Sequence, residues 1–256
     1  MARNYWTDHS AFLAAAYLND SRIVRFEMVT RAIAHQLPKN ATILDVGGGC
    51  GRQAISLARQ GYKVLVLDPD NNMLSAARQN LSRQSGEVQD RVEIRNGRGE
   101  DAVLLLSGRQ FDAVCCHSVF MYLDDINPLL NAIVAVTKPG GLISVLSVNP
   151  KSVAMRAGLQ ERWEDALNTI SSPDYHEAQY VASTKYSIRT FRDAFQKRGV
   201  EFVRWLGVGV FTDHLFIDAT TANLPIIFEL EWQAGRTAPY KNVARCFHMI
   251  LTRGTS

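Results

Sequence analysis

The chain lacks any apolar run long enough to cross a membrane, since no stretch of its 256 residues approaches roughly 18 consecutive apolar positions. The first ten residues, MARNYWTDHS, also lack the apolar core of a secretory signal peptide. Cysteine is scarce, and no pair has zinc-ligand or C-x-x-C spacing among Cys50, Cys115, Cys116 and Cys246. We therefore expect a cytoplasmic protein with reduced thiols, no membrane contact and no bound metal.

A large excess of charge of either sign is also missing. The 28 Lys and Arg residues nearly balance the 25 Asp and Glu residues, giving a formal net charge of +3. So small an excess does not by itself indicate a nucleic-acid partner. A hydrophobic content of 46% is typical of a globular protein with a full core. The length predicts one α/β domain with an insertion or cap.

What the chain does have is a glycine-rich turn at residues 47–51. Residues 43–46 have the pattern of the end of a buried strand, and apolar positions from Arg52 onward fall at helical spacing. A strand, a glycine turn and a helix form the opening unit of a doubly wound nucleotide-binding sheet. Glycine allows a positive φ and lets a ligand approach the backbone. The helix start then offers unpaired N–H groups to the polar end of that ligand.

The residues around the turn indicate which nucleotide it binds. Asp45 stands two residues before Gly47, and the glycines alternate through Gly49 and Gly51. Dinucleotide-binding folds space their glycines as G-x-G-x-x-G/A and usually lack this acid. A carboxylate here would repel a pyrophosphate but suits a cofactor with a cationic amino-acid end. A redox Rossmann domain and a glycine turn without a nucleotide remain the alternatives.

A second acid supports a ribose site. Residues 63–67 form the next predicted strand, and Asp68 follows it, 23 residues after Asp45. This separation is close to the roughly 20 residues at which Rossmann-type sheets place their ribose-binding acid. We expect the Asp68 carboxylate to accept hydrogen bonds from both ribose hydroxyls. Met73, in the helix that residues 69–70 open, is expected beside the adenine.

Hydrophobic periodicity predicts the other elements. They are helices over 22–36, 128–136 and 186–198, strands over 91–95, 111–117 and 142–148, and two final strands over 200–210 and 246–252, antiparallel and swapped in sheet order. Arg22 and Arg25 share one face of the first helix, and either could reach the carboxylate of a cofactor. Solvated arginines on a surface helix are the alternative.

His117 stands at the carboxyl end of the fourth predicted strand, where open α/β sheets bind their ligands. We expect it at the reacting centre, either as a general base or packed beside the cofactor. The sequence favours neither role over the other.

The motifs over residues 43–148 together resemble the class I S-adenosylmethionine (SAM)-dependent methyltransferases. The resemblance rests on the Asp45-led glycine loop, on Asp68, on the turn at 97–101 and on the Lys-Pro-Gly-Gly run at 138–141. It implies a Rossmann-like α/β fold with a mostly parallel seven-stranded sheet, helices on both faces and an inserted cap. It implies SAM as the cofactor, with Gly99 and Glu100 at the adenine.

Within one methyltransferase domain over 1–256, we expect four parts. They are an N-terminal helical lid over 1–40, a SAM-binding core over 41–148, a substrate-covering insertion over 151–185 and the rest of the sheet over 186–256. A helical pair without a substrate role is the alternative for the insertion.

The C-terminal half resembles the bacterial tRNA 5-carboxymethoxyuridine methyltransferases. The matching residues are His117-Ser118-Val119, 207–213, Glu229-Leu230-Glu231, Pro239-Tyr240, Arg245 and His248. We assign Tyr122, Tyr240 and Arg245 to the acceptor site. Two departures count against a shared substrate: Gly209 replaces an arginine, and residues 151–185 lack a lysine cluster for tRNA phosphates.

These patterns favour methyl transfer to an oxygen or nitrogen of a small polar acceptor. The alternative is esterification of a carboxylate on a wobble uridine in tRNA. A SAM-binding protein without catalysis, or an NAD-linked oxidoreductase, is the third hypothesis.

Overall fold

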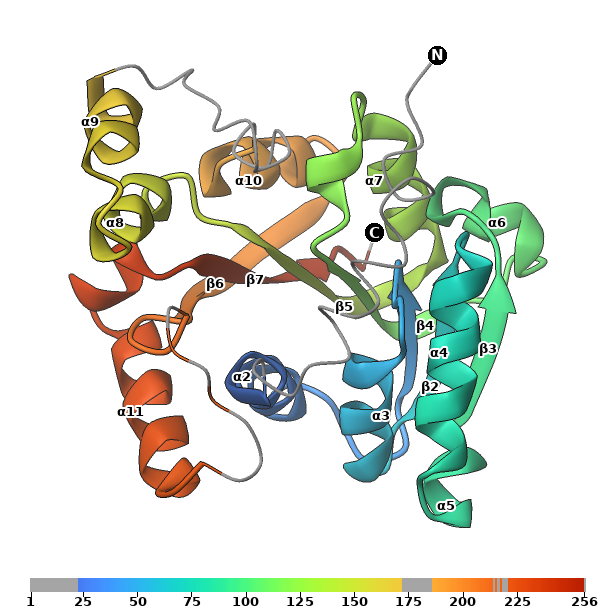
Figure 1. Ribbon diagram of the computed structural model, residues 1–256. Coiled ribbons are helices and arrows are strands. Elements are labelled where there is room, and N and C mark those ends of the chain that lie inside the picture. Colours follow the sequence, from blue (N-terminus) through green and yellow to red (C-terminus); the bar gives the residue numbers. More distant parts are fainter. Residues whose placement is uncertain (1–22, 172–185, 214, 216, 218–220, 256) are drawn as a thin grey trace.

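The computed structural model describes residues 23–171, 186–213, 215, 217 and 221–255 (Figure 1). Its seven-stranded sheet has the order β3-β2-β1-β4-β5-β7-β6. The strands are β1 (Thr42–Val46), β2 (Lys63–Asp68), β3 (Val92–Asn96), β4 (Phe111–His117), β5 (Thr137–Val148), β6 (Val200–Val208) and β7 (Cys246–Arg253). β1 to β5 pair in parallel, whereas β7 is antiparallel to both of its neighbours. This is the mostly parallel α/β fold that the sequence predicts.

Helices cover both faces of this sheet. In order they are α2 (Ile23–Ala34), α3 (Arg52–Arg59), α4 (Asn71–Ser82), α5 (Gly86–Gln89), α6 (Ala102–Leu105), α7 (Asn127–Val136), α8 (Ser152–Leu159), α9 (Trp163–Ser171), α10 (Ile188–Gln196) and α11 (Leu224–Arg236). Three 3₁₀ turns accompany them: η1 (Gly99–Asp101), η2 (Phe120–Tyr122) and η3 (Tyr240–Val243). In Figure 1, α7 and α10 lie above the sheet, and α2, α3 and α11 lie below it.

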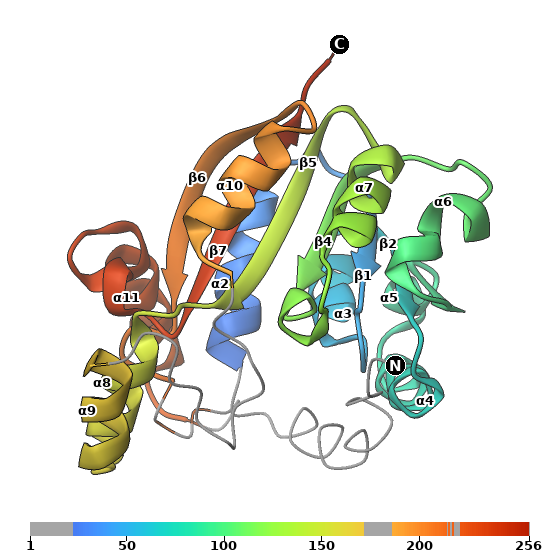
Figure 2. The same cartoon turned by 90° about the horizontal axis from the view of Figure 1, so that it is seen from above.

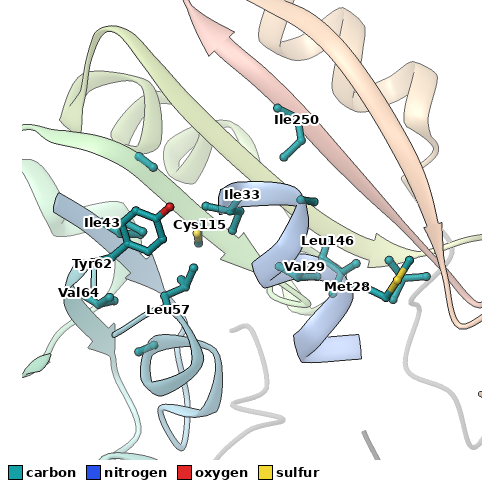
Figure 3. Close-up of a cluster of buried hydrophobic side chains, with 14 of the residues drawn as sticks. Met28, Val29, Ile33, Ile43, Leu57, Tyr62, Val64, Cys115, Leu146 and Ile250 are labelled. Carbon is teal, nitrogen blue, oxygen red and sulfur yellow. The ribbon is translucent and has the colours of Figure 1, made fainter. Parts of the chain in front are cut away.

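Each face of the sheet has its own apolar core. Beneath the sheet, Met28, Val29 and Ile33 of α2 pack with Leu57 of α3 and Trp232 of α11 (Figure 3). On the other face, apolar side chains of α7 and α10 pack against the alternate residues of the same strands. Central parallel strands are buried on both faces, and β1 and β4 are accordingly almost continuous apolar runs.

The last two strands are antiparallel and swapped in sheet order, as the sequence predicts. β7 inserts between β5 and β6. Because β7 is antiparallel to both of these neighbours, β6 runs in the same direction as β5. The loops that leave β5 and β6 therefore lie at the same edge of the sheet as the glycine turn. Figure 2 shows α8 and α9 beyond this edge, past the end of β5.

The structure differs from the sequence-based expectations at the start of β5 and at α11. The Lys-Pro-Gly-Gly run does not precede the fifth strand but lies inside it, because β5 begins at Thr137. A register shift opposite Phe111 and Ala113 accommodates the run, and Gly140 takes a positive φ of 74° there. Helix α11 was not predicted at all. Apolar side chains occupy several of its faces, with Ile226 and Leu230 exposed and Trp232 buried, which weakens any helical stripe.

Several expectations fall outside the described residues. They include the part of the proposed lid over 1–22, with Arg22, and the part of the insertion over 172–185. Within 151–171 the insertion forms α8 and α9. Among the described residues, no helix is long and apolar enough to cross a membrane.

Candidate active site

A cavity of about 560 Å³ opens at the carboxyl ends of the parallel strands. Ten residues singled out from the sequence line it: Arg25, Asp45, Gly47, Gly49, Asp68, Met73, Gly99, Glu100, His117 and Tyr122. They come from seven different elements and the turns between them. The parallel register of β2, β1 and β4 brings these segments to one edge.

The glycine turn between β1 and α3 forms one wall of the cavity. Gly47, Gly49 and Gly51 have positive φ values of 67°, 53° and 75°, a region that side-chain-bearing residues rarely adopt. A Cβ at Gly47 would also collide with Val119. The glycines therefore allow the backbone conformation of the turn, and they also let a ligand come close to its backbone.

Asp45 is the most strongly perturbed group in this wall. Its residue is 2% exposed, and its Oδ2 has no hydrogen-bond partner among the described residues. Burial, and then the negative charge of Asp68, raises its pKa from 3.8 to about 7. A buried carboxylate without a partner is unfavourable unless a cation or a donor reaches it. The cavity thus offers a site for a cationic group beside Asp45.

Asp68 shapes the turn from the end of β2. Its Oδ2 accepts from the Gly49 N–H at 2.9 Å, and its Oδ1 accepts from the Asp70 N–H at 2.9 Å. Burial raises the pKa of Asp68 despite these two hydrogen bonds. Each carboxylate oxygen keeps further acceptor capacity, so hydroxyl groups in the cavity could still donate to it. Asp70 caps α4 by accepting the N–H groups of Asn72 and Met73 at 2.8 and 2.9 Å.

Met73 and the turn at η1 also line the cavity. Met73 is 3% exposed, and a Cβ on Gly49 would lie 2.9 Å from its ε-methyl group. Gly99 is buried, and a Cβ on it would collide with Val46 and Leu129. Glu100 is held by an ion pair with Arg98, at 3.0 Å.

Arg25 reaches the cavity from α2. Its guanidinium donates a hydrogen bond to the Ser118 hydroxyl, which lies just beyond the end of β4. Arg25 and Asp45 thus both line the cavity. A cation and a carboxyl group in one cavity suit the carboxylate and amino groups of an amino acid.

His117 lies at the end of β4 in a chain of hydrogen bonds. Its Nε2 is 2.8 Å from the Ser144 hydroxyl, which is 2.7 Å from Nε2 of His248. Its Nδ1 is buried without a partner among the described residues. Burial, then His248 and Arg25, lowers the pKa of His117 well below 6.5. The imidazole is therefore neutral, and neither ring nitrogen is presented to solvent.

Comparison with known proteins identifies the family. A model of the methyltransferase domain matches residues 44–143. The tRNA 5-carboxymethoxyuridine methyltransferase of Escherichia coli K12 is 23% identical over 255 residues, 91% of this chain and 88% of that protein. The ubiquinone biosynthesis O-methyltransferase of Cereibacter sphaeroides is 31% identical over 166 residues, 60% of this chain and 64% of that protein. The chain belongs to the SAM-dependent methyltransferases.

Solved structures agree with this in fold. A chain from the complex of a Haloferax volcanii methyltransferase with its Trm112 activator superimposes with a TM-score of 0.61 at 17% identity. The match covers 99% of this methyltransferase and all of that chain. Its Rossmann-like architecture is thus shared with distant methyltransferases.

Two residues expected at the acceptor site do not line the cavity of this methyltransferase. Tyr240 is 49% exposed and lies against Phe211, with ring centroids 6.0 Å apart. Arg245 forms an ion pair with Asp213, at 3.8 Å. Both belong to the loops that precede β7, so they stand at the same edge of the sheet as the cavity but beside it.

Several residues around the cavity were not singled out from the sequence. They are Arg52, Gln53, Arg98, Asp124 and Asp125 in its lining, and Ser144 behind His117. His248, which carries part of the resemblance, lies on the far side of Ser144. The first five are polar residues in turns or at helix starts, which gives no distinctive pattern. Among the described residues, no cluster of His, Cys, Asp and Glu side chains could hold a metal ion.

Proposed function

We propose that this enzyme transfers the methyl group of SAM to an oxygen or nitrogen of a small polar acceptor, releasing S-adenosylhomocysteine. The observation that carries the proposal is a single cavity lined both by the Asp45 and Asp68 walls and by the end of β4. When bound, SAM supplies a methyl group that is already activated as part of a sulfonium. The protein's task is to align an acceptor with that methyl group.

The walls of the cavity fit SAM in three parts. Asp45 and Arg25 suit the amino and carboxylate groups of its methionine end, because the Asp45 Oδ2 has no partner among the described residues and Arg25 is cationic. Asp68 suits the ribose hydroxyls. Met73, Gly99 and Glu100 suit the adenine, because they line the same cavity and Met73 is apolar.

The acceptor would then lie near His117, Ser118 and Tyr122. We assign His117 a positioning role at this centre rather than that of a base. Its Nε2 is engaged by Ser144, its Nδ1 is buried, and its pKa is lowered well below 6.5. A neutral amine or a carboxylate, which attacks without first losing a proton to the protein, suits such a wall better than a hydroxyl.

The size and charge of the site support a small acceptor. A cavity of about 560 Å³ is within the usual range for small-molecule sites. In the described part of the insertion, Lys151, Arg156 and Arg162 are balanced by Glu161, Glu164 and Asp165. Phosphate contacts supply most of the affinity for nucleic acids, so a segment without excess positive charge favours a small molecule.

A tRNA carboxylate is the second candidate. The relative from Escherichia coli, named for such an activity, aligns with nearly the whole chain. Tyr240 and Arg245, beside the cavity, would then meet an acceptor too large to enter it. A carboxylate acceptor needs no base, which agrees with a neutral His117.

Incubation with radiolabelled SAM separates the two candidates. The wild-type enzyme and the Asp68→Ala variant are each given bulk tRNA or a metabolite extract, and the products are divided by size and by ribonuclease treatment. Label in small molecules, absent with Asp68→Ala, supports the main proposal. Label that ribonuclease releases from tRNA instead supports the second candidate and overturns the first.

We also propose that the enzyme works in the cytoplasm as one domain over 1–256. Its four cysteines are free and buried, as expected where thiols stay reduced. The parts over 1–40, 41–148, 151–185 and 186–256 would act as lid, SAM-binding core, substrate cover and remainder of the sheet.

A further inference from the structure

Three neighbouring strands bring a row of polar side chains together behind the cavity. Ser144 of β5 lies between His117 of β4 and His248 of β7, and its hydroxyl is within hydrogen-bond distance of both imidazoles. Ser144 and His248 are fully buried and do not line the cavity, whereas His117 does. The two rings meet edge to face, with centroids 5.8 Å apart. Only His117 can therefore carry any effect of this row into the cavity.

Hydrogen-bond capacity restricts the states of this row. A hydroxyl has one proton to donate and two lone pairs with which to accept. The Ser144 hydroxyl is within hydrogen-bond distance of the Nε2 atoms of both imidazoles. It can give its proton to at most one of them. At least one of the two imidazoles must therefore carry its proton on Nε2 and donate it to Ser144.

The surroundings keep both rings neutral. Arg25 approaches them from α2 and Arg204 approaches His248 from β6, so a proton added to either ring would face a like charge. Burial acts in the same direction, and the pKa of His248 falls to about 3. With both rings neutral, the hydrogen bonds that link His117 through Ser144 to His248, called the bridge below, persist across the whole physiological pH range.

The bridge also fixes the ring of His117 in one orientation. Nδ1 of each ring is already buried without a partner among the described residues. If the His117 ring turned away from Ser144, its Nε2 would lose its partner as well, which is unfavourable for a buried polar group. A ring at the cavity wall is thus held by a residue that the ligand never touches.

We propose that Ser144 is a positioning residue for methyl transfer: through its bridge to His248 it holds the His117 ring as a fixed wall against which the acceptor aligns. This inference rests on the proposed acceptor site near His117. A misplacement of about 1 Å at a reacting centre can lower turnover about 100-fold. Removal of the bridge should therefore lower transfer while leaving the cofactor's part of the cavity intact.

The bridge itself is tested by nitrogen NMR of the ¹⁵N-labelled full chain bound to S-adenosylhomocysteine. Long-range ¹H–¹⁵N spectra distinguish the two neutral tautomers and the cation of each histidine. The chain has six histidines, so His117→Gln and His248→Gln variants assign the two signals. We expect both rings to stay neutral between about pH 5.5 and pH 8.5, with at least one protonated on Nε2. In Ser144→Ala, the His117 signal should shift towards a mixture of both tautomers.

Transfer is measured with radiolabelled SAM and whichever pool, bulk tRNA or metabolite extract, the wild type labels. Ser144→Ala should lower labelling about 10- to 100-fold and change the dissociation constant for S-adenosylhomocysteine less than twofold. Ser144→Thr, which keeps the hydroxyl, should restore much of the labelling. Ser147→Ala removes another buried serine from the same strand and serves as the control, with wild-type behaviour expected.

Each failure has a distinct meaning. A wild-type His117 that titrates near its ordinary pKa of about 6.5, or an unchanged His117 tautomer in Ser144→Ala, overturns the bridge. An altered tautomer with wild-type labelling overturns the positioning role and leaves the proposed function standing. No binding of S-adenosylhomocysteine and no labelled pool defeats the proposed function, while spectra of the unbound protein still decide the bridge. If Ser144→Ala does not fold, His248→Gln tests the same link from the other side.

Discussion

Asp45→Asn should make the ligand-free protein more stable and its cofactor binding weaker. The carboxyl of Asp45, whose Oδ2 has no partner among the described residues, has a pKa of about 7 in the folded protein against 3.8 ordinarily. At pH 8 the folded protein must hold this group ionised in a site that disfavours its charge. One pKa unit corresponds to about 1.4 kcal/mol, so the difference of about three units costs about 4 kcal/mol.

The direction of this change in the free energy of unfolding follows from the raised pKa of Asp45. Well below pH 3.8 the carboxyl is protonated in both the folded and unfolded states, so Asp and Asn should then give similar stabilities. Between about pH 4 and about pH 7 the unfolded state is ionised and the folded state is not, so the wild type loses stability as the pH rises and the variant does not. Above about pH 7 the loss is complete. The free energy of unfolding of Asp45→Asn should therefore exceed that of wild type by up to about 4 kcal/mol at pH 8.

Urea unfolding of both proteins, followed by circular dichroism at pH 5, 6, 7 and 8, gives this difference directly. Calorimetry with S-adenosylhomocysteine gives the binding cost, expected at about 1.5–3 kcal/mol for a lost charged hydrogen bond. A variant less stable than wild type at pH 8, a gain independent of pH, or unchanged binding would each refute the reasoning.

Three further predictions use other parts of the site. Asp68→Ala should weaken S-adenosylhomocysteine binding by about 2–3 kcal/mol with the circular dichroism spectrum intact; unchanged affinity in calorimetry would mean that the ribose site lies elsewhere. Because His117 and His248 stay neutral in the folded protein, each ring should lower the free energy of unfolding below about pH 6.5 by up to about 1.4 kcal/mol per pH unit, while protonation of Asp45 acts in the opposite direction. In urea titrations the fall should therefore be smaller in His248→Gln than in the wild type by up to about 1.4 kcal/mol per pH unit, and an equal slope contradicts the assignment. Glu231→Ala, which strips the acceptor from the N–H groups of residues 210–212, should lower the unfolding free energy by about 3 kcal/mol or more without changing cofactor affinity, and a loss of affinity would contradict the separation of this loop from the cavity.

The meeting of Asp45, the glycine turn and Asp68 at one cavity was predictable because its determinants are local. Asp45, the glycines and Asp68 lie at fixed distances along the chain from strands with plain apolar patterns. Parallel packing then brings the strand ends together whatever the rest of the chain does. The start of α4 was likewise predictable from Asp70, whose side chain caps the helix by accepting hydrogen bonds from two N–H groups.

The region behind and beside the cavity was not predictable, because it depends on contacts between distant segments. Ser144 meets His248 only through the register of β5 with β7, a pairing across about a hundred residues that no local pattern specifies. Glu231 is fully buried in α11, where its carboxylate accepts hydrogen bonds from the backbone of a loop about twenty residues earlier in the chain. The resemblance placed Tyr240 at the acceptor, whereas the packing of its loop against Phe211 leaves it outside the cavity.

Calorimetric titration of the wild-type protein tests the central claim most directly. With SAM and S-adenosylhomocysteine in turn, the account predicts one site per chain with a dissociation constant in the micromolar range, about −8 kcal/mol. With NAD it predicts no measurable heat, because the Asp45 carboxyl at the glycine turn disfavours a pyrophosphate. Binding of NAD, together with no binding of SAM, would contradict the account.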